Sequence, residues 1–157
     1  MKKTNALRLL DAANISYTSR EYDVSDGDLS GVTVAKKLGQ EPERVFKTLV
    51  TEGKQNGLCV FIIPVNAELD LKKAAVASSD KNIEMIKSKE LEPKTGYVHG
   101  GCSPIGMKKL FPTFIDETVV LYDTIFVSGG KIGLQIDIAL CDLIEMTNAA
   151  LCDLTKE

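Results

Sequence analysis

The sequence predicts a mixed α+β (mixed α/β) fold, in which a curved, mostly antiparallel sheet is flanked by helices. Helix-type and strand-type patterns interleave along the chain without the regular strand–helix alternation of a doubly wound fold. Two apolar runs, 45–50 and 58–65, are separated by the turn-forming segment 52–57, which is typical of a hairpin. The length of 157 residues suits one domain, so we expect residues 1–157 to form a single unit.

The N-terminal third begins with a clear helix signal. Thr4 is a good N-cap for a helix that we expect to run to about Ala13, because apolar residues recur there at helical spacing. Residues 15–23 follow as a strand. A short helix is expected over 33–38, with Gly39 in the place of a C-cap.

The central part is organised around a strand that carries Lys47. Pro42 suits the first turn of a short helical segment leading into this strand. The run 58–65 is continuously apolar and is expected to be a central strand buried on both faces. The segment 92–96 is predicted to be a turn. Further helices are expected over 70–77, 80–87, 105–110 and 142–149, and further strands over 97–99, 114–116, 124–127 and 133–138.

Composition excludes several classes of protein. Lysine and arginine total 19 and aspartate and glutamate total 22, so a net charge of −3 gives no global attraction to nucleic acid. The lysines between positions 72 and 89 are expected to be solvated helix faces rather than a nucleic-acid footprint. No run reaches the roughly 18 apolar residues of a membrane span, and the first residues lack the apolar part of a signal peptide. We therefore expect a cytoplasmic protein.

The cysteines and the single histidine do not form a recognisable metal or redox motif. The four cysteines show neither a C-x-x-C pair nor a zinc-binding spacing, so no metal and no cofactor is expected. Cys102 lies three residues after His99, but no third group is evident to orient such a pair. A spectator role is the better interpretation of both residues.

Lys47 is an unusual residue at its position. It stands in the run Phe46-Lys47-Thr48-Leu49, whose neighbours are apolar. One interpretation is a lysine that points to solvent from the polar face of an edge strand. The other is a fixed cation inside a cleft, placed to hold an anion or a polarised carbonyl.

Two glycine turns favour the second interpretation. Gly100-Gly101 precedes Ser103-Pro104, and a turn that feeds a helix N-terminus exposes backbone N–H groups to an anion or carbonyl. Ser128-Gly129 opens a second turn, and Asp137 lies in the strand that returns from it. Taken alone, Asp137 reads as an exposed polar position on an alternating strand. Together with Lys47 these residues form the candidate site.

Three motifs in the same order resemble the YbaK-type aminoacyl-tRNA deacylase family, which is related to the editing domain of bacterial prolyl-tRNA synthetases. They are FKTL at 46–49, GGCSPIG at 100–106 and SGG-x-x-GLQI at 128–136. The resemblance extends over nearly the whole chain. It implies a mixed sheet with a cleft over the Lys47 strand.

The resemblance also implies roles for individual residues. Lys47 matches the essential lysine of the family, and the turn at Gly100 and Gly101 matches the backbone that lines the aminoacyl pocket. Ser30 stands where the family often has an aromatic residue, which alters one wall of the pocket. The remaining matches to pocket positions are Tyr22, Ser128, Gly129 and Asp137.

The implied activity is removal of cysteine wrongly attached to tRNA(Pro), and also to tRNA(Cys). In this family the thiol of the substrate attacks its own ester carbonyl and releases a thiolactone, so the protein needs to supply positioning rather than a nucleophile. One alternative is hydrolytic editing of another small aminoacyl group, such as alanine on tRNA(Pro). Another is a non-catalytic tRNA-binding or protein-binding module. Because the chain is acidic, we expect weak tRNA selection by the chain alone and transient recruitment by prolyl-tRNA synthetase.

Overall fold

The computed structural model describes residues 2–157 and has the mixed α+β architecture expected from the sequence. The helices are α1 (Asn5–Ala12), α2 (Gly31–Leu38), α3 (Leu71–Ala77), α4 (Ser88–Thr95) and α5 (Leu140–Thr147), with short 3-10 turns at Pro42–Arg44 and Glu117–Leu121. The strands are β1 (Thr18–Glu21), β2 (Phe46–Gly53), β3 (Gly57–Pro64), β4 (Ile83–Met85), β5 (Thr113–Asp116), β6 (Thr124–Ser128), β7 (Leu134–Ala139) and β8 (Ala150–Cys152).

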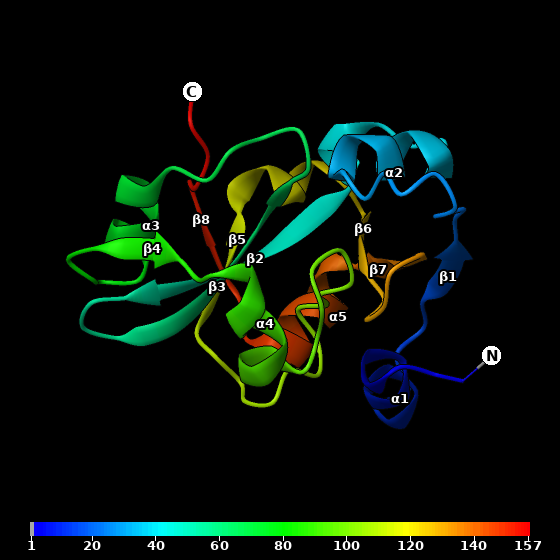
Figure 1. The fold of residues 1–157 in the computed structure, drawn as a ribbon, viewed down its shortest axis with the longest axis horizontal. Coiled ribbons are helices and arrows are strands. Elements are labelled where there is room, and N and C mark those ends of the chain that lie inside the picture. The colour runs from blue at the N-terminus through cyan, green and yellow to red at the C-terminus, as the bar shows by residue number, and fades with distance from the viewer. Residues whose placement is uncertain (1) are drawn as a thin grey trace.

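The strands form two sheets that meet at one corner. A five-stranded sheet has the order β4-β2-β3-β5-β8, and a three-stranded sheet has the order β1-β7-β6. The pairs β3–β5 and β5–β8 are parallel, and the other pairs are antiparallel. A single bridge between Val45 and Phe126 joins the sheets, and α2 lies over this junction (Figure 1).

The central strand β3 is buried on both faces, as its continuous apolar run predicted. Val60 and Ile62 pack into the main core with α1, α5 and the three-stranded sheet. Phe61 and Ile63 pack on the other face against α3 and the C-terminal segment. Because side chains alternate along a strand, one unbroken apolar run serves both cores.

Local capping signals were confirmed where the sequence was most explicit. The Thr4 hydroxyl accepts from the Leu7 N–H at the start of α1, and the Asp70 carboxylate accepts from the Lys72 and Lys73 N–H groups at the start of α3. Gly39 ends α2 with φ +69°, a conformation that glycine adopts without strain.

The prediction of a helix over residues 80–87 was wrong. Asp80 instead accepts backbone N–H groups from the β2–β3 turn, including those of Gln55 and Asn56, and β4 then pairs with the end of β2. The turn expected over 92–96 is the end of α4. Pro93 is tolerated there, since the carbonyl it leaves free belongs to the exposed Lys89.

The strand expected over 97–99 and the helix expected over 105–110 are also absent from the structure of residues 2–157. The Ser103 hydroxyl does accept from the Ile105 N–H, as an N-cap would. Gly106 then adopts φ +83°, which is incompatible with a right-handed helix, so no helix continues from this cap. The last helix stops at Thr147, two residues early, because Asn148 adopts φ +58°. This leaves 150–152 free to form β8.

No helix within residues 2–157 is long and apolar enough to cross a membrane.

Candidate functional site

A pocket of about 240 Å³ lies beside β2, at the corner where the two sheets meet. Its walls come from β2, the segment before α2, the turn at 99–102, and the strands β6 and β7. Of the residues predicted from the sequence, those that line it are Tyr22, Ser30, Lys47, Gly100 and Ser128. Segments that are far apart in the chain therefore converge on one cavity, as the candidate site required.

The pocket follows a stretch of β2 whose outer edge is open. β4 pairs with residues 51–53 of β2, and the Ile86 N–H just after β4 donates to the Val50 carbonyl, so only residues 46–49 lack such a partner on that side. The Val65 N–H donates to the Val45 carbonyl, so Val45 and every second residue after it direct their main-chain groups toward β3. Main-chain groups alternate between the two edges of a strand. Those of Thr48, a residue of the pocket lining, therefore face the open edge.

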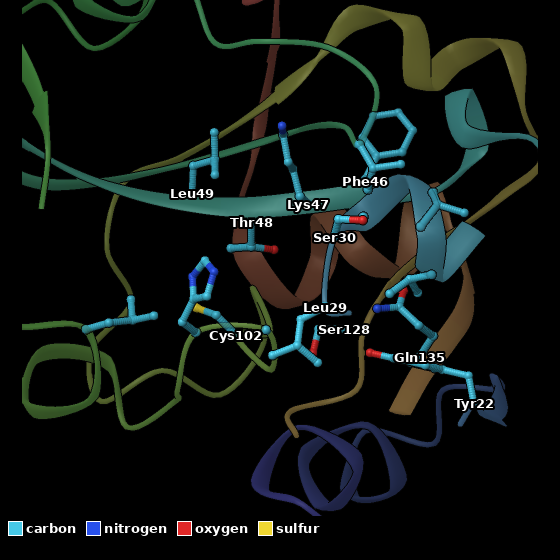
Figure 2. A pocket seen from close by; sticks show the side chains of 17 residues that line it. Tyr22, Leu29, Ser30, Phe46, Lys47, Thr48, Leu49, Cys102, Ser128 and Gln135 are labelled. Atoms are coloured by element: carbon cyan, nitrogen blue, oxygen red, sulfur yellow. The ribbon is translucent and has the colours of Figure 1, made fainter. Parts of the chain in front are cut away.

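Lys47 is partly buried and lines the pocket. Its side chain points to the opposite side of β2 from Thr48 (Figure 2). Burial lowers the pKa of Lys47, and the negative charge of Glu68 partly offsets this effect. No carboxylate within residues 2–157 forms an ion pair with it. The cation is therefore available to an external anion or carbonyl oxygen.

The wall before α2 is built by three consecutive residues. Ser30 is exposed, and its hydroxyl donates to the Thr33 hydroxyl at 2.9 Å instead of capping the helix. Gly31 packs so closely on Val65 that a Cβ there would lie 2.6 Å from the valine side chain. Leu29 turns into the pocket (Figure 2) and supplies the apolar surface that the serine lacks. A Cβ added to Gly100 would lie 3.1 Å from the Leu29 Cδ1.

The two glycine turns touch each other. A Cβ on Gly101 would lie 2.7 Å from the Ile132 backbone nitrogen, so only glycine allows the turn at 100–101 to reach the turn at 129–133. The Gly101 N–H already donates to the Val98 carbonyl, and the Gly129 N–H to the Leu134 carbonyl. Neither Gly101 nor Gly129 lines the pocket. The backbones of Gly101 and Gly129 instead hold their neighbours Gly100 and Ser128 in place in the pocket wall.

β6 and β7 contribute a pair of polar side chains. Ser128 and Gln135 lie directly opposite each other in the antiparallel ladder, and both are buried. The Ser128 oxygen accepts from the Gly130 N–H at 3.2 Å, which leaves its own hydrogen free to donate into the pocket. Tyr22, Ser128 and Gln135 lie together on this wall (Figure 2).

Asp137 is two residues further along β7 and is not part of the pocket lining. Its two carboxylate oxygens each lie 3.4 Å from a terminal nitrogen of Arg44. The guanidinium also stacks over Phe126, with 5.2 Å between its carbon and the ring centroid. The structure therefore places the carboxylate at the junction of the sheets, where it orients an arginine.

The residues set aside in the sequence, His99 and Cys102, both line the pocket. Burial raises the pKa of the Cys102 thiol to about 12, so at neutral pH it is protonated and a poor nucleophile. Within residues 2–157, no group of three or more histidine, cysteine or acidic side chains is placed to hold a metal ion.

Sequence reasoning missed Leu29, Thr48 and Gln135 as pocket residues. Gln135 is a polar residue between Leu134 and Ile136, and such a position on an alternating strand is expected to be exposed, whereas the structure buries it. The register that places it opposite Ser128, and so into the pocket, was not known from the sequence.

Comparisons with known proteins agree on one family. The profile of the aminoacyl-tRNA editing domain matches residues 30–146. The chain is 47% identical, over 99% of its own length and 95% of the relative's, to EbsC of Enterococcus faecalis, named as a Cys-tRNA(Pro)/Cys-tRNA(Cys) deacylase. A proline–tRNA ligase of Thermosipho melanesiensis is 27% identical over 62% of this chain, which corresponds to 17% of the ligase.

A solved structure described as a trans-editing enzyme for prolyl-tRNA synthetase shares the fold. It has a TM-score of 0.84 at 22% identity, and the match covers 100% of both chains. The profile covers most of this sequence, and EbsC matches almost all of it. The chain belongs to the aminoacyl-tRNA editing domain family.

Proposed function

We propose that this protein is a trans-editing deacylase that removes cysteine from mischarged Cys-tRNA(Pro), and also from Cys-tRNA(Cys), in the cytoplasm. The observation that carries the proposal is the small pocket beside the open edge of β2, with Lys47 on its lining and no activated nucleophile in it. The name of the Enterococcus faecalis relative supports the same substrate.

The reaction that fits this pocket uses the substrate's own sulfur. The cysteinyl thiol attacks the ester carbonyl, a carbon–sulfur bond forms, and the bond to the terminal ribose oxygen breaks. The thiol proton ends on that oxygen, so the products are a cysteine thiolactone and uncharged tRNA. Holding the thiol and carbonyl in near-attack geometry supplies about 7–11 kcal/mol of the barrier.

Lys47 serves this reaction as an anchor or as a polarising group, and not as a general base. Its ammonium is unpaired within residues 2–157 and is directed to one side of the open β2 edge. Preorganised donors of this kind each contribute about 3–4 kcal/mol when aimed at a developing oxyanion. The Gly100 N–H is a second candidate donor, since it makes no hydrogen bond within residues 2–157.

The remaining pocket residues shape the site. Tyr22, Ser30 and Ser128 form its polar rim and wall, and the backbones of Gly101 and Gly129 hold the two turns against each other. Asp137 acts indirectly through Arg44 at the sheet junction. We place all of these in one domain, residues 1–157, that requires no cofactor and no metal.

A panel of charged tRNAs tests the proposal. Purified protein is mixed with Cys-tRNA(Pro), Cys-tRNA(Cys), Ala-tRNA(Pro) and Pro-tRNA(Pro), and loss of each ester is followed against a Lys47→Ala control. We expect the cysteinyl tRNAs to be discharged, with the rate falling about 100-fold or more in the control. Discharge of Ala-tRNA(Pro) alone would replace this function with hydrolytic editing, and no discharge would indicate a binding module.

The choice between tRNAs is proposed to come from prolyl-tRNA synthetase in a transient complex. The net charge of −3 offers little general attraction to the phosphate backbone. We expect the protein alone to discharge Cys-tRNA(Pro) and Cys-tRNA(Cys) at similar rates. Added synthetase should raise only the rate for Cys-tRNA(Pro), and strong discrimination without it would contradict this part of the proposal.

A further inference from the structure

Gln135 is a buried amide without a protein partner. It is 7% exposed and lines the pocket from β7. Its amide oxygen accepts no hydrogen bond from residues 2–157. Buried polar groups are almost always hydrogen-bonded, so an unpaired amide needs an explanation.

A second buried side-chain oxygen without a hydrogen-bond partner lies in the same pocket. Within the described chain, Thr48 and Gln135 carry the only buried side-chain oxygen or nitrogen atoms that lack a partner, and both residues line this cavity. They stand on different walls, Thr48 on β2 and Gln135 on β7, and both point inward (Figure 2). Two unsatisfied oxygens that converge on one cavity indicate a ligand group that donates hydrogen bonds.

The charges of the pocket restrict what that group is. Its lining contains Lys47 but no carboxylate, and Asp137 is held by Arg44 outside the lining. The ester oxygens of an aminoacyl-tRNA only accept hydrogen bonds, and a thiol is a weak donor. The α-amino group is the donor-rich part of such a substrate.

We propose that Gln135, assisted by the Thr48 hydroxyl, forms the subsite that binds the α-amino group of the aminoacyl ester. This inference rests on the proposed function, because it takes the ligand to be an aminoacyl ester. With the amino group fixed there, the ester lies along the open edge of β2.

The test uses two ligands that the protein does not cleave. Cysteine is linked through an amide to 3′-amino-3′-deoxyadenosine, and its partner carries 3-mercaptopropionate, which lacks only the α-amino group. Dissociation constants are measured by calorimetry for the wild type, Gln135→Met and Gln135→Glu. Methionine keeps the length of glutamine without its hydrogen bonds, whereas glutamate keeps two acceptor oxygens.

We expect the wild type to bind the amino ligand at least about tenfold more tightly than its partner. This preference should fall to within about twofold in Gln135→Met and should persist in Gln135→Glu. An unchanged preference in Gln135→Met, its loss in Gln135→Glu, or no binding of either ligand by the wild type would overturn the proposal.

Thermal stability separates this role from a structural one. Because no protein group is left unpaired, Gln135→Met should keep its Tm or raise it by about 2–4 °C. The matched control is Gln40→Met, since Gln40 accepts a hydrogen bond from Arg44 at 3.1 Å and its loss should lower the Tm. A large fall in Tm or failure to fold in Gln135→Met would contradict the proposal.

Neither ligand is cleaved, so the binding preference does not depend on deacylation. A wild type that shows the preference but leaves Cys-tRNA(Pro) intact would refute the proposed function and retain the subsite. A wild type that discharges Cys-tRNA(Pro) without the preference would refute the subsite alone.

Discussion

Replacing Gly101 with alanine tests the contact that builds the pocket wall. A Cβ there would lie 2.7 Å from the Ile132 nitrogen, 2.8 Å from the Lys131 carbonyl carbon and 2.9 Å from the Lys131 Cα. Ordinary contact begins at 3.4 Å, so the backbone must retreat by about 0.5–0.7 Å. Backbone atoms cannot swing aside as a side chain can. We therefore expect a loss of about 3 kcal/mol in the free energy of unfolding.

Thermal and urea denaturation measure this loss, which corresponds to a fall in Tm of about 6–12 °C for a chain of this size. The control is Gly27→Ala, because Gly27 has φ +72° and nothing within 4 Å of an added Cβ. It should show only the left-handed backbone cost of about 1–2 kcal/mol. If Gly101→Ala were no more destabilising than this control, the close approach of the two turns would be refuted.

Three further predictions concern charge and reactivity in and beside the pocket. Burial lowers the pKa of Lys47, so the wild-type deacylation rate should fall as the pH rises through a value below 10.5. Arginine stays charged at higher pH, so the residual rate of Lys47→Arg should persist to a higher pH than the wild-type rate does. If both proteins lost activity at the same alkaline pH, after subtraction of the uncatalysed loss of the ester, this prediction would be wrong. Asp137→Asn should weaken the contact with Arg44 and lower the free energy of unfolding by about 0.5–1 kcal/mol. Its deacylation rate should stay within about twofold of the wild-type rate. A hundredfold loss of deacylation rate in a folded variant would show that Asp137 takes part in the chemistry. Because burial raises the pKa of Cys102 to about 12, Cys102→Ala should keep the rate within about fivefold, and rapid alkylation of Cys102 at pH 7 would show that its thiol is more reactive than we infer.

The lowered pKa of Lys47 also makes the free energy of unfolding depend on pH. Between the lowered pKa of the folded state and the ordinary value of 10.5, the unfolded chain binds more protons than the folded one at Lys47. Stability therefore rises with pH across that window. The difference in unfolding free energy between Lys47→Ala and the wild type should favour the variant at neutral pH and shrink as the pH approaches 10.5.

Elements with local signals could be predicted from the sequence. The Thr4 and Asp70 caps, the Gly39 stop and the alternating burial of β3 all follow from neighbouring residues. The segment 80–112 could not be predicted in the same way. Asp80 looks like a helix cap in the sequence, but its partners come from the β2–β3 turn.

The sequence indicates which face of each strand carries the candidate site residues, but not which of these residues line the cavity. Gln135 and Asp137 lie on the same face of β7, and alternation along a strand cannot say which of them enters a cavity. That choice depends on Arg44, which holds Asp137 at the sheet junction, and on Ser128, which stands opposite Gln135. Lys47 was recognisable from the sequence because a lysine inside an apolar run needs a reason.

The chemical identity of the released product distinguishes attack by the substrate thiol from hydrolysis. Cys-tRNA(Pro) labelled in the cysteine is incubated with the purified protein, and the released compound is trapped and identified by mass spectrometry. Since the pocket lining offers positioning and a cation, and burial keeps the Cys102 thiol protonated, we expect cysteine thiolactone as the first product. Free cysteine formed at the same rate with no thiolactone before it, together with equal turnover of Ser-tRNA(Pro), would refute attack by the substrate thiol.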